Sequence, residues 1–201
     1  MPVFRSAGAL LSRLHALPVT TAERERSPLM AGEGDGPGRA LGRARGTLAT
    51  CLDRGFLTAA EALETGRRLE AWRPPPGSSR LSFVHGDFQL NNLLVSATAP
   101  DQIVGLLDFS GSHFGHPEED LPRLLCTSLD LDLSQALAEA VLDGYGDQSS
   151  ALPFFLLCER LDLWKFIKDL RVDWVDQSLG FTDWLAPYLT VALRWSSSPR
   201  R

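Results

Sequence analysis

The chain has 201 residues, 44% of them hydrophobic, and a formal net charge of −5, a composition typical of a soluble globular protein with one ordinary domain or two small ones. The negative charge and the lack of a dense run of Lys and Arg argue against a nucleic-acid surface. No apolar stretch has the roughly 18 residues of a membrane helix, and the three cysteines lie among leucines, so we expect no membrane association and buried thiols in a reducing cytoplasm.

The first third of the chain is predicted to hold two helices and a loop. Ala7, Leu10, Leu11, Leu14 and Leu17 recur at steps of three and four, which predicts an amphipathic helix that ends at Pro18. Residues 20–46 are rich in Gly, Pro, Glu and Arg, and we expect a flexible loop there. Residues 58–61 read Thr-Ala-Ala-Glu, a capping box for a helix that continues to about Trp72.

The last third is also predicted to be helical. Asp132 and Gln135 are candidate caps of a helix that stops near Gly144. A longer apolar stretch over residues 154–174 continues the helical pattern, and a short last helix is expected to end around Trp195. Residues 196–201 are expected to form a disordered tail, so that the folded part covers residues 1–195.

In the middle of the chain the hydrophobic pattern changes to that of short strands. Asn92–Val95 and Ile103–Phe109 flank a polar connection, which predicts an antiparallel hairpin. In such a hairpin the start of the first strand lies beside the end of the second, so Asn92 and Asp108 should meet. Asp87 lies just upstream, on the loop that leads to the same end. Two carboxylates and an amide oxygen are ligands that suit Mg²⁺.

Three blocks in this region carry a family resemblance. They are His-Gly-Asp with Asn five positions after the Asp (residues 85–92), Asp-Phe at 108–109, and Gly-x-Pro-x-x-Asp-Leu at 115–121. Their order parallels the catalytic loop and metal-binding motif of protein kinases, with glycine in place of the arginine. Over residues 1–190 the chain resembles the aminoglycoside phosphotransferase and choline kinase-like family of small-molecule kinases. The resemblance implies a mainly α (α+β) fold like the C-terminal lobe of protein kinases, with a small β hairpin that carries the site.

The same resemblance implies a role for each matching residue. Asp87 would be the catalytic carboxylate that accepts a proton from the substrate hydroxyl, and Asn92 and Asp108 would hold Mg²⁺ that bridges the phosphates of ATP. His85 and Asp120 would support the loop. Two positions depart from the motif: Asn91 stands where the family often has glycine, and Ser110 follows Asp-Phe where protein kinases have glycine.

The N-terminal β lobe that covers the nucleotide in such kinases is not expected in this chain, because the first predicted helix begins almost at Met1. The chain has two lysines, Lys165 and Lys168, and both lie far downstream of the catalytic block, so neither is expected to be the phosphate-binding strand lysine. The nucleotide-binding residues are therefore unassigned, and a partner chain is one source of the missing lobe. The leading hypothesis is ATP-dependent phosphoryl transfer to a hydroxyl of a small molecule. The alternative is a truncated, inactive kinase-like binding or interaction module.

Several other features have simpler interpretations. Turn chemistry alone accounts for Asp and Asn beside a hairpin, but it does not predict the block at 115–121. His113 and His116 could be imagined with His85 as a zinc site, but no cysteine lies near and loop histidines are the favoured reading. Ser112 lacks the motif of a nucleophile elbow. The downstream aromatic residues are expected in the core: Trp164, Phe166, Trp174, Phe181 and Trp184. The downstream aspartates are expected on solvated helix faces: Asp162, Asp169, Asp173, Asp176 and Asp183. For both sets the other possibility is that they line a substrate cleft.

Overall fold

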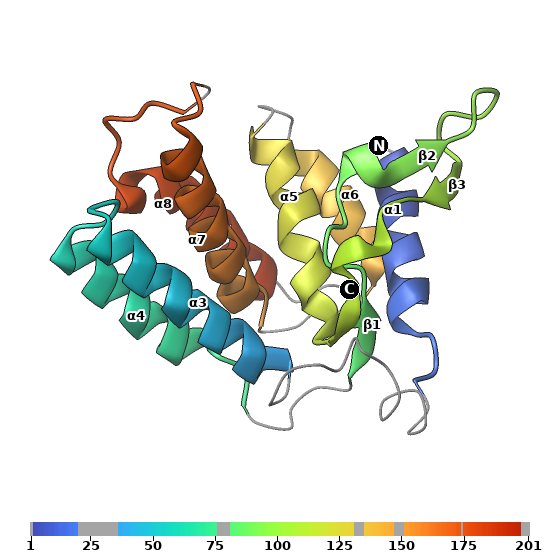
Figure 1. Ribbon diagram of the computed structural model, residues 1–201. Coiled ribbons are helices and arrows are strands. Elements are labelled where there is room, and N and C mark those ends of the chain that lie inside the picture. The colour runs from blue at the N-terminus through green and yellow to red at the C-terminus, as the bar shows by residue number, and fades with distance from the viewer. Residues whose placement is uncertain are drawn as a thin grey trace. The chain divides into compact units, whose positions relative to one another are not determined.

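The computed structural model describes residues 2–19, 36–75, 81–130, 135–146, 151–173 and 175–197 (Figure 1). Within these ranges the chain is mainly helical with a few short strands, as the sequence predicts. The chain divides into two compact units, residues 1–36 with 79–149 and residues 37–78 with 150–201. The single lobe expected over residues 1–195 stays a prediction. No described helix is long and apolar enough to cross a membrane.

The described residues of the first unit include the helices α1 (Pro2–His15), α5 (Leu121–Asp130) and α6 (Gln135–Tyr145). Helices α1 and α6 lie side by side (Figure 1). A Cβ on Gly8 would lie 1.9 Å from the Val141 carbonyl oxygen, and one on Gly144 would lie 2.0 Å from the Arg5 carbonyl oxygen. Only glycine at these two positions permits this backbone approach. Helix α1 ends at His15, before the predicted Pro18, so Leu17 lies past the helix and is half exposed.

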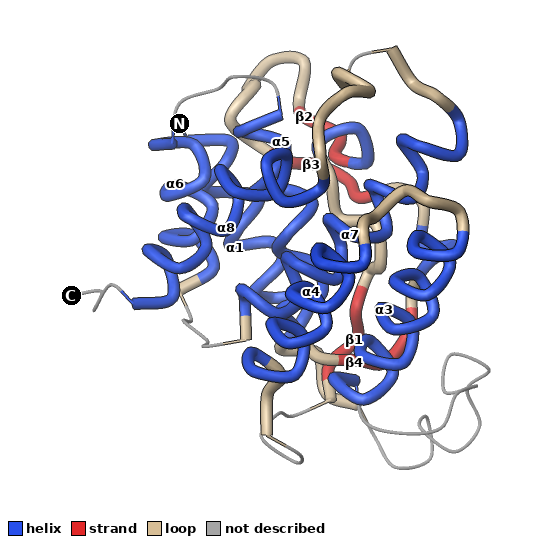
Figure 2. The backbone as a smooth tube through the Cα atoms, turned by 90° about the vertical axis from the view of Figure 1, so that its left-hand side faces the viewer, coloured by secondary structure: helices blue, strands red, loops and turns tan. Residues whose placement is uncertain are grey.

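In the part of the first unit that the structure describes, four strands form two antiparallel pairs (Figure 2). Strand β1 (Ser82–Val84) pairs with β4 (His113–Gly115), and β2 (Leu93–Val95) pairs with β3 (Ile103–Leu106). The second pair is the predicted hairpin, slightly shorter than expected. Each pair contributes one strand before and one strand after the connection 96–102, so the two pairs place residues 85–92 close to residues 107–112.

The second unit contains α3 (Gly36–Asp53), α4 (Ala59–Trp72), α7 (Leu152–Leu170) and α8 (Phe181–Ser197). The capping box of α4 is confirmed: the Thr58 hydroxyl accepts from the Glu61 N–H at 3.2 Å, and the Glu61 carboxylate accepts from the Thr58 N–H at 2.8 Å. Helix α4 also ends at the predicted Trp72.

The core of the second unit is aromatic, as predicted for most of these residues. Trp164, Phe181 and Trp184 are buried and their rings pack together, whereas Phe166 is half exposed and Trp174 lies outside the described residues. The aspartates on α7 pair at the surface: Asp162 pairs with Arg43, and Asp169 pairs with Arg54 and Lys165.

Two predicted boundaries were wrong. The flexible loop expected over residues 20–46 is wrong for residues 36–46, which belong to α3. Residues 20–35 lie outside the described part, and the prediction stays open there. Ala40, Leu41 and Ala44 are at most 2% exposed, so their apolar contacts outweigh the low helix propensity of the surrounding glycines. Helix α8 continues to Ser197, beyond the predicted Trp195 and into the expected tail, and residues 198–201 lie outside the described residues. The proposed cap Asp132 also lies outside the described residues.

Candidate active site

The loop between β1 and β2 brings Asp87 and Asn92 together. A 3-10 turn, η2 (Leu90–Asn92), turns the chain back toward Asp87. The Asn92 side-chain amide donates to the Asp87 carbonyl oxygen at 2.8 Å and to Asp87 Oδ2 at 2.9 Å. The Gln89 side-chain amide donates to the same Oδ2 at 2.9 Å. Both hydrogen bonds to Oδ2 restrict the orientation of the Asp87 carboxylate.

Asp108 follows β3 at the same end of the hairpin. The Leu107 N–H donates to the Asn92 carbonyl oxygen at 2.8 Å, so Asp108 lies one residue after a backbone hydrogen bond with Asn92. Asp108 has a left-handed backbone, with φ of 59°, and its Oδ1 accepts from the Ser110 hydroxyl at 2.5 Å and from the Ser110 N–H at 3.3 Å. These two hydrogen bonds, the hydroxyl first, lower the pKa of the exposed Asp108 carboxyl.

Of the three residues predicted at the metal site, Asp87 and Asn92 are in side-chain contact, and Asp108 lies one residue beyond a backbone hydrogen bond with Asn92. Among the residues that the structure describes, no group of three His, Cys, Asp or Glu side chains could hold a metal ion. The amide oxygen of Asn92 and the carboxylate of Asp108 remain the candidate ligands, and their convergence on one cation stays a prediction.

His85 supports the loop from the buried side. The residue is fully buried, and its Nδ1 lies 3.2 Å from the Asp87 N–H, from which it accepts a hydrogen bond. Nε2 must then carry the ring proton, and it donates to the Leu107 carbonyl oxygen at 2.9 Å. One imidazole therefore joins the backbone of Asp87 to the backbone just before Asp108. These contacts are those of a structural histidine.

Asp120 has the backbone contacts expected of it. It is 2% exposed, its Oδ2 accepts from the His85 N–H at 2.7 Å, and its Oδ1 accepts from the Gly86 N–H at 2.8 Å. Gly86 has a left-handed φ of 82°, and a Cβ there would lie 2.2 Å from the Gly111 carbonyl oxygen. The loop of this chain therefore requires glycine at this position.

Arg123 was not predicted to belong to the site. Its guanidinium forms an ion pair with Asp87 Oδ1, and its side chain is 42% exposed. It lies on α5, three residues after Asp120, which is one helical turn later. That spacing was the available signal, because a residue one turn after a loop-anchoring aspartate faces the same loop.

His113, His116 and Ser112 each have a local partner. His113 Nε2 lies 2.9 Å from Glu119 Oε2, and His116 Nδ1 accepts from the Glu118 N–H at 3.2 Å, where it caps the turn η4 (Pro117–Asp120). The Ser112 hydroxyl donates to the His85 carbonyl oxygen at 3.2 Å. The loop-histidine interpretation accounts for these contacts, and Ser112 contributes one more hydrogen bond to the loop after β1.

A helical unit with a short hairpin, an aspartate loop after β1 and a second aspartate after β3 has the architecture of kinase-like folds. The chain belongs to the APH phosphotransferase enzyme family, whose model matches residues 3–155. No curated protein matches the sequence.

Solved structures of low sequence identity share the fold. Aminoglycoside phosphotransferase APH(3'')-Id from Streptomyces rimosus, in complex with ADP and streptomycin, is 21% identical, with a TM-score of 0.56 over 80% of this chain and 62% of that one. Macrolide 2'-phosphotransferase MphH from Brachybacterium faecium is 19% identical, with a TM-score of 0.55 over 100% of this chain and 61% of that one. A Ralstonia eutropha protein described as an aminoglycoside phosphotransferase is 15% identical, with a TM-score of 0.65 over 100% of this chain and 66% of that one. The chain thus spans less than two thirds of the length of these three proteins.

Proposed function

We propose that the chain carries the catalytic site of an ATP-dependent phosphotransferase that acts on a hydroxyl group of a small molecule. The observation that supports this function best is the contact of Asp87 with Asn92 on the loop after β1, with Asp108 beside Asn92 at the end of the hairpin. These three residues match the family motif in type and spacing.

Asp87 is the general base in this proposal. Its Oδ1 pairs with Arg123 and its Oδ2 accepts from Asn92 and Gln89, so donors fix both oxygens. A carboxylate has about four acceptor sites, and three are used here, which leaves capacity for a substrate hydroxyl. The Asp87 side chain is 23% exposed, so a substrate can reach it. The carboxylate orients the hydroxyl and accepts its proton as the phosphoryl group is transferred.

Asn92 and Asp108 are the residues that would hold Mg²⁺. Asn92 uses its amide N–H groups on Asp87, which leaves its amide oxygen as a ligand. An aspartate is ionised at neutral pH, and the hydrogen bonds from Ser110 lower the pKa of the Asp108 carboxyl further. One carboxylate and one amide oxygen fit an ion that takes its remaining ligands from water and phosphate. Bound Mg²⁺ would offset the negative charge of the nucleotide phosphates.

The phosphate donor and acceptor are proposed by analogy. The Streptomyces rimosus relative binds ADP and streptomycin, which supports a nucleotide donor and an aminoglycoside-like or macrolide-like acceptor. The nucleotide-binding residues stay unassigned, and a partner chain that supplies a nucleotide lobe is part of the proposal. A second candidate is a binding module without turnover. It is favoured because neither lysine is assigned to a nucleotide: Lys165 pairs with Asp169, and Lys168 donates to the Gln177 carbonyl oxygen.

Acceptor-dependent release of ADP tests the proposed function. The chain is incubated with ATP, Mg²⁺ and a panel of aminoglycosides, macrolides and amino alcohols. Asp87→Ala should lower kcat on the order of 10²- to 10⁴-fold, because the general base is lost. Asp143→Ala, which removes an exposed carboxylate, is the control and should leave kcat unchanged. Equal turnover in Asp87→Ala and the unchanged chain would refute the role of Asp87. Absence of both turnover and a melting-temperature shift with Mg²⁺-ATP would favour the second candidate.

A further inference from the structure

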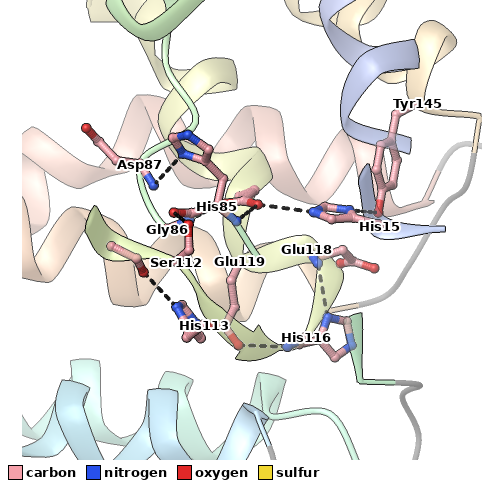
Figure 3. Close-up of polar contacts among 12 residues, drawn as sticks. His15, His85, Gly86, Asp87, Ser112, His113, His116, Glu118, Glu119 and Tyr145 are labelled. Atoms are coloured by element: carbon pink, nitrogen blue, oxygen red, sulfur yellow. Dashed lines mark hydrogen bonds and ion pairs between the residues drawn. The ribbon is translucent and has the colours of Figure 1, made fainter. Parts of the chain in front are cut away.

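A buried chain of polar side chains reaches the catalytic loop from helices α1 and α6. His15, the last residue of α1, is 6% exposed. Its Nε2 lies 3.1 Å from Asp120 Oδ2, and its Nδ1 lies 2.9 Å from the Tyr145 hydroxyl at the end of α6. Figure 3 shows the His15 ring between Tyr145 and the loop that carries His85 and Gly86. These contacts join residues that are 105 and 130 positions apart in the sequence.

The hydrogen-bond directions follow from the partners of Asp120. Its two carboxylate oxygens already accept from the backbone N–H groups of His85 and Gly86, as an acceptor-only group does. His15 Nε2 therefore carries a proton and donates to Oδ2, while Nδ1 is held by the Tyr145 hydroxyl. Tyr145 also packs edge-on against the imidazole, with ring centroids 5.6 Å apart. The His15 ring is thus held at both nitrogens.

Removal of the His15 donor would act on the catalytic loop through Asp120. The Asp120 carboxylate is buried, so a lost donor cannot be replaced at low cost, and the side chain would turn or admit water. Either change would weaken the contacts with the His85 and Gly86 amides. Gly86 tolerates little adjustment, because its left-handed backbone already lies close to Gly111. Asp87 is the next residue along the chain.

We infer that His15 and Tyr145 are positioning residues for the catalytic loop. His15 orients Asp120, Asp120 holds the amides of His85 and Gly86, and these amides fix the direction in which Asp87 presents its carboxylate. The close approach of α1 and α6 at Gly8 and Gly144 brings the two helices that supply this pair together. The inference rests on the proposed function, because the loop is catalytic only if Asp87 is the base.

Two substitutions at His15 separate the contact with Asp120 from the contact with Tyr145. The amide nitrogen of glutamine reaches about as far as Nε2 of histidine, whereas the amide of asparagine reaches about as far as Nδ1. His15→Gln keeps a donor for Asp120, and His15→Asn loses it. Leu11→Ala is the control, because Leu11 is fully buried on α1 and this substitution destabilises the helix packing without removing a polar contact of the loop.

The experiment uses the whole chain and two readouts. Hydrogen exchange of the peptide that contains His85, Gly86 and Asp87 should accelerate at least tenfold in His15→Asn and stay within about threefold of the unchanged chain in His15→Gln and Leu11→Ala. The kcat of His15→Asn should fall roughly tenfold to a hundredfold with KM changed less than about threefold, because a misdirected base affects the transition state more than binding. Tyr145→Phe should give a smaller loss in the same direction.

Each result decides the inference. It is supported if asparagine impairs the loop and glutamine restores it. It is overturned if His15→Asn, His15→Gln and Leu11→Ala give the same loop exchange once matched for stability, or if only KM changes. The exchange readout needs no turnover. A chain that is inactive with every acceptor would therefore refute the proposed function, while exchange would still decide whether His15 holds the loop.

Discussion

The loop of residues 85–92 has two sides that are built from similar residue types but differ in burial. On the buried side, His85, Asp120 and His15 are each at most 6% exposed, and backbone or aromatic groups fix their positions. On the open side, Asp87 and Arg123 form an ion pair that solvent reaches, and Asp108 is exposed.

This difference separates what is fixed from what can exchange partners. A buried hydrogen bond is costly to break, because the freed group has no water to replace its partner. An exposed ion pair exchanges with water at little cost. The buried side therefore determines the shape of the loop, and the open side can release its contacts when a ligand arrives. Substitutions on the two sides should affect stability very differently.

The largest stability effect is expected from Asp120→Asn. The new amide presents N–H groups where the carboxylate accepted from His15, His85 and Gly86, so at least one buried donor loses its acceptor. The free energy of unfolding should fall by about 3 kcal/mol, measured by urea titration. Asp143→Asn makes the same chemical change at an exposed ion pair with Arg5 and should cost less than about 1 kcal/mol. Similar losses in both variants would contradict the contrast between the two sides.

A much smaller stability effect is expected from Arg123→Ala. The ion pair with Asp87 is partly exposed, and such pairs contribute about 0 to 1 kcal/mol. A double-mutant cycle of Arg123→Ala and Asp87→Asn, measured by urea titration, should therefore give a coupling energy below about 1 kcal/mol. A coupling of 3 kcal/mol or more would place this pair with the buried contacts, and the open side would then be as rigid as the buried one.

The sequence predicted those features that depend on residues close to one another along the chain. The capping box at Thr58 and Glu61, the hairpin over β2 and β3, and the contact of Asp87 with Asn92 all depend on spacings of three to about fifteen residues. At such spacings the local backbone geometry alone brings side chains together, so residue type and interval suffice.

The features that the sequence did not predict depend on tertiary contacts. His15 contacts Asp120 although 105 residues separate them, and Arg123 contacts Asp87 across 36 residues. Both contacts form only when the elements of the first unit pack together. The sequence did not predict the start of α3, because its glycines and arginines are typical of a linker. The helix forms there because Ala40, Leu41 and Ala44 are buried. A histidine on an apolar helix face gives no local indication of its partner, so His15 could be read from the sequence only as an interruption of an apolar run.

The smallest expected effect concerns the pKa of Asp108, and the chain contains a matched control for it. Asp108 accepts from the hydroxyl and N–H of Ser110, and Asp176 accepts from the hydroxyl and N–H of Ser178 in the same Asp-x-Ser arrangement. In both turns the serine hydroxyl, followed by the serine amide, lowers the pKa of the carboxyl.

Ser110→Ala should raise the pKa of Asp108 toward its ordinary value and leave that of Asp176 unchanged, and Ser178→Ala should do the reverse, both read by NMR titration of the carboxyl carbons without metal. Because the folded pKa is the lower one, each carboxylate adds stability above its unfolded pKa and loses that contribution as the pH falls through its folded pKa. The local turn therefore explains the lowered pKa without a metal site.

Addition of Mg²⁺ with a nucleotide then distinguishes a metal ligand from a turn residue: if Asp108 is a ligand, its carboxyl resonance shifts and that of Asp176 does not. Equal responses of the two carboxylates would reduce Asp108 to a turn residue and remove one of the two proposed metal ligands.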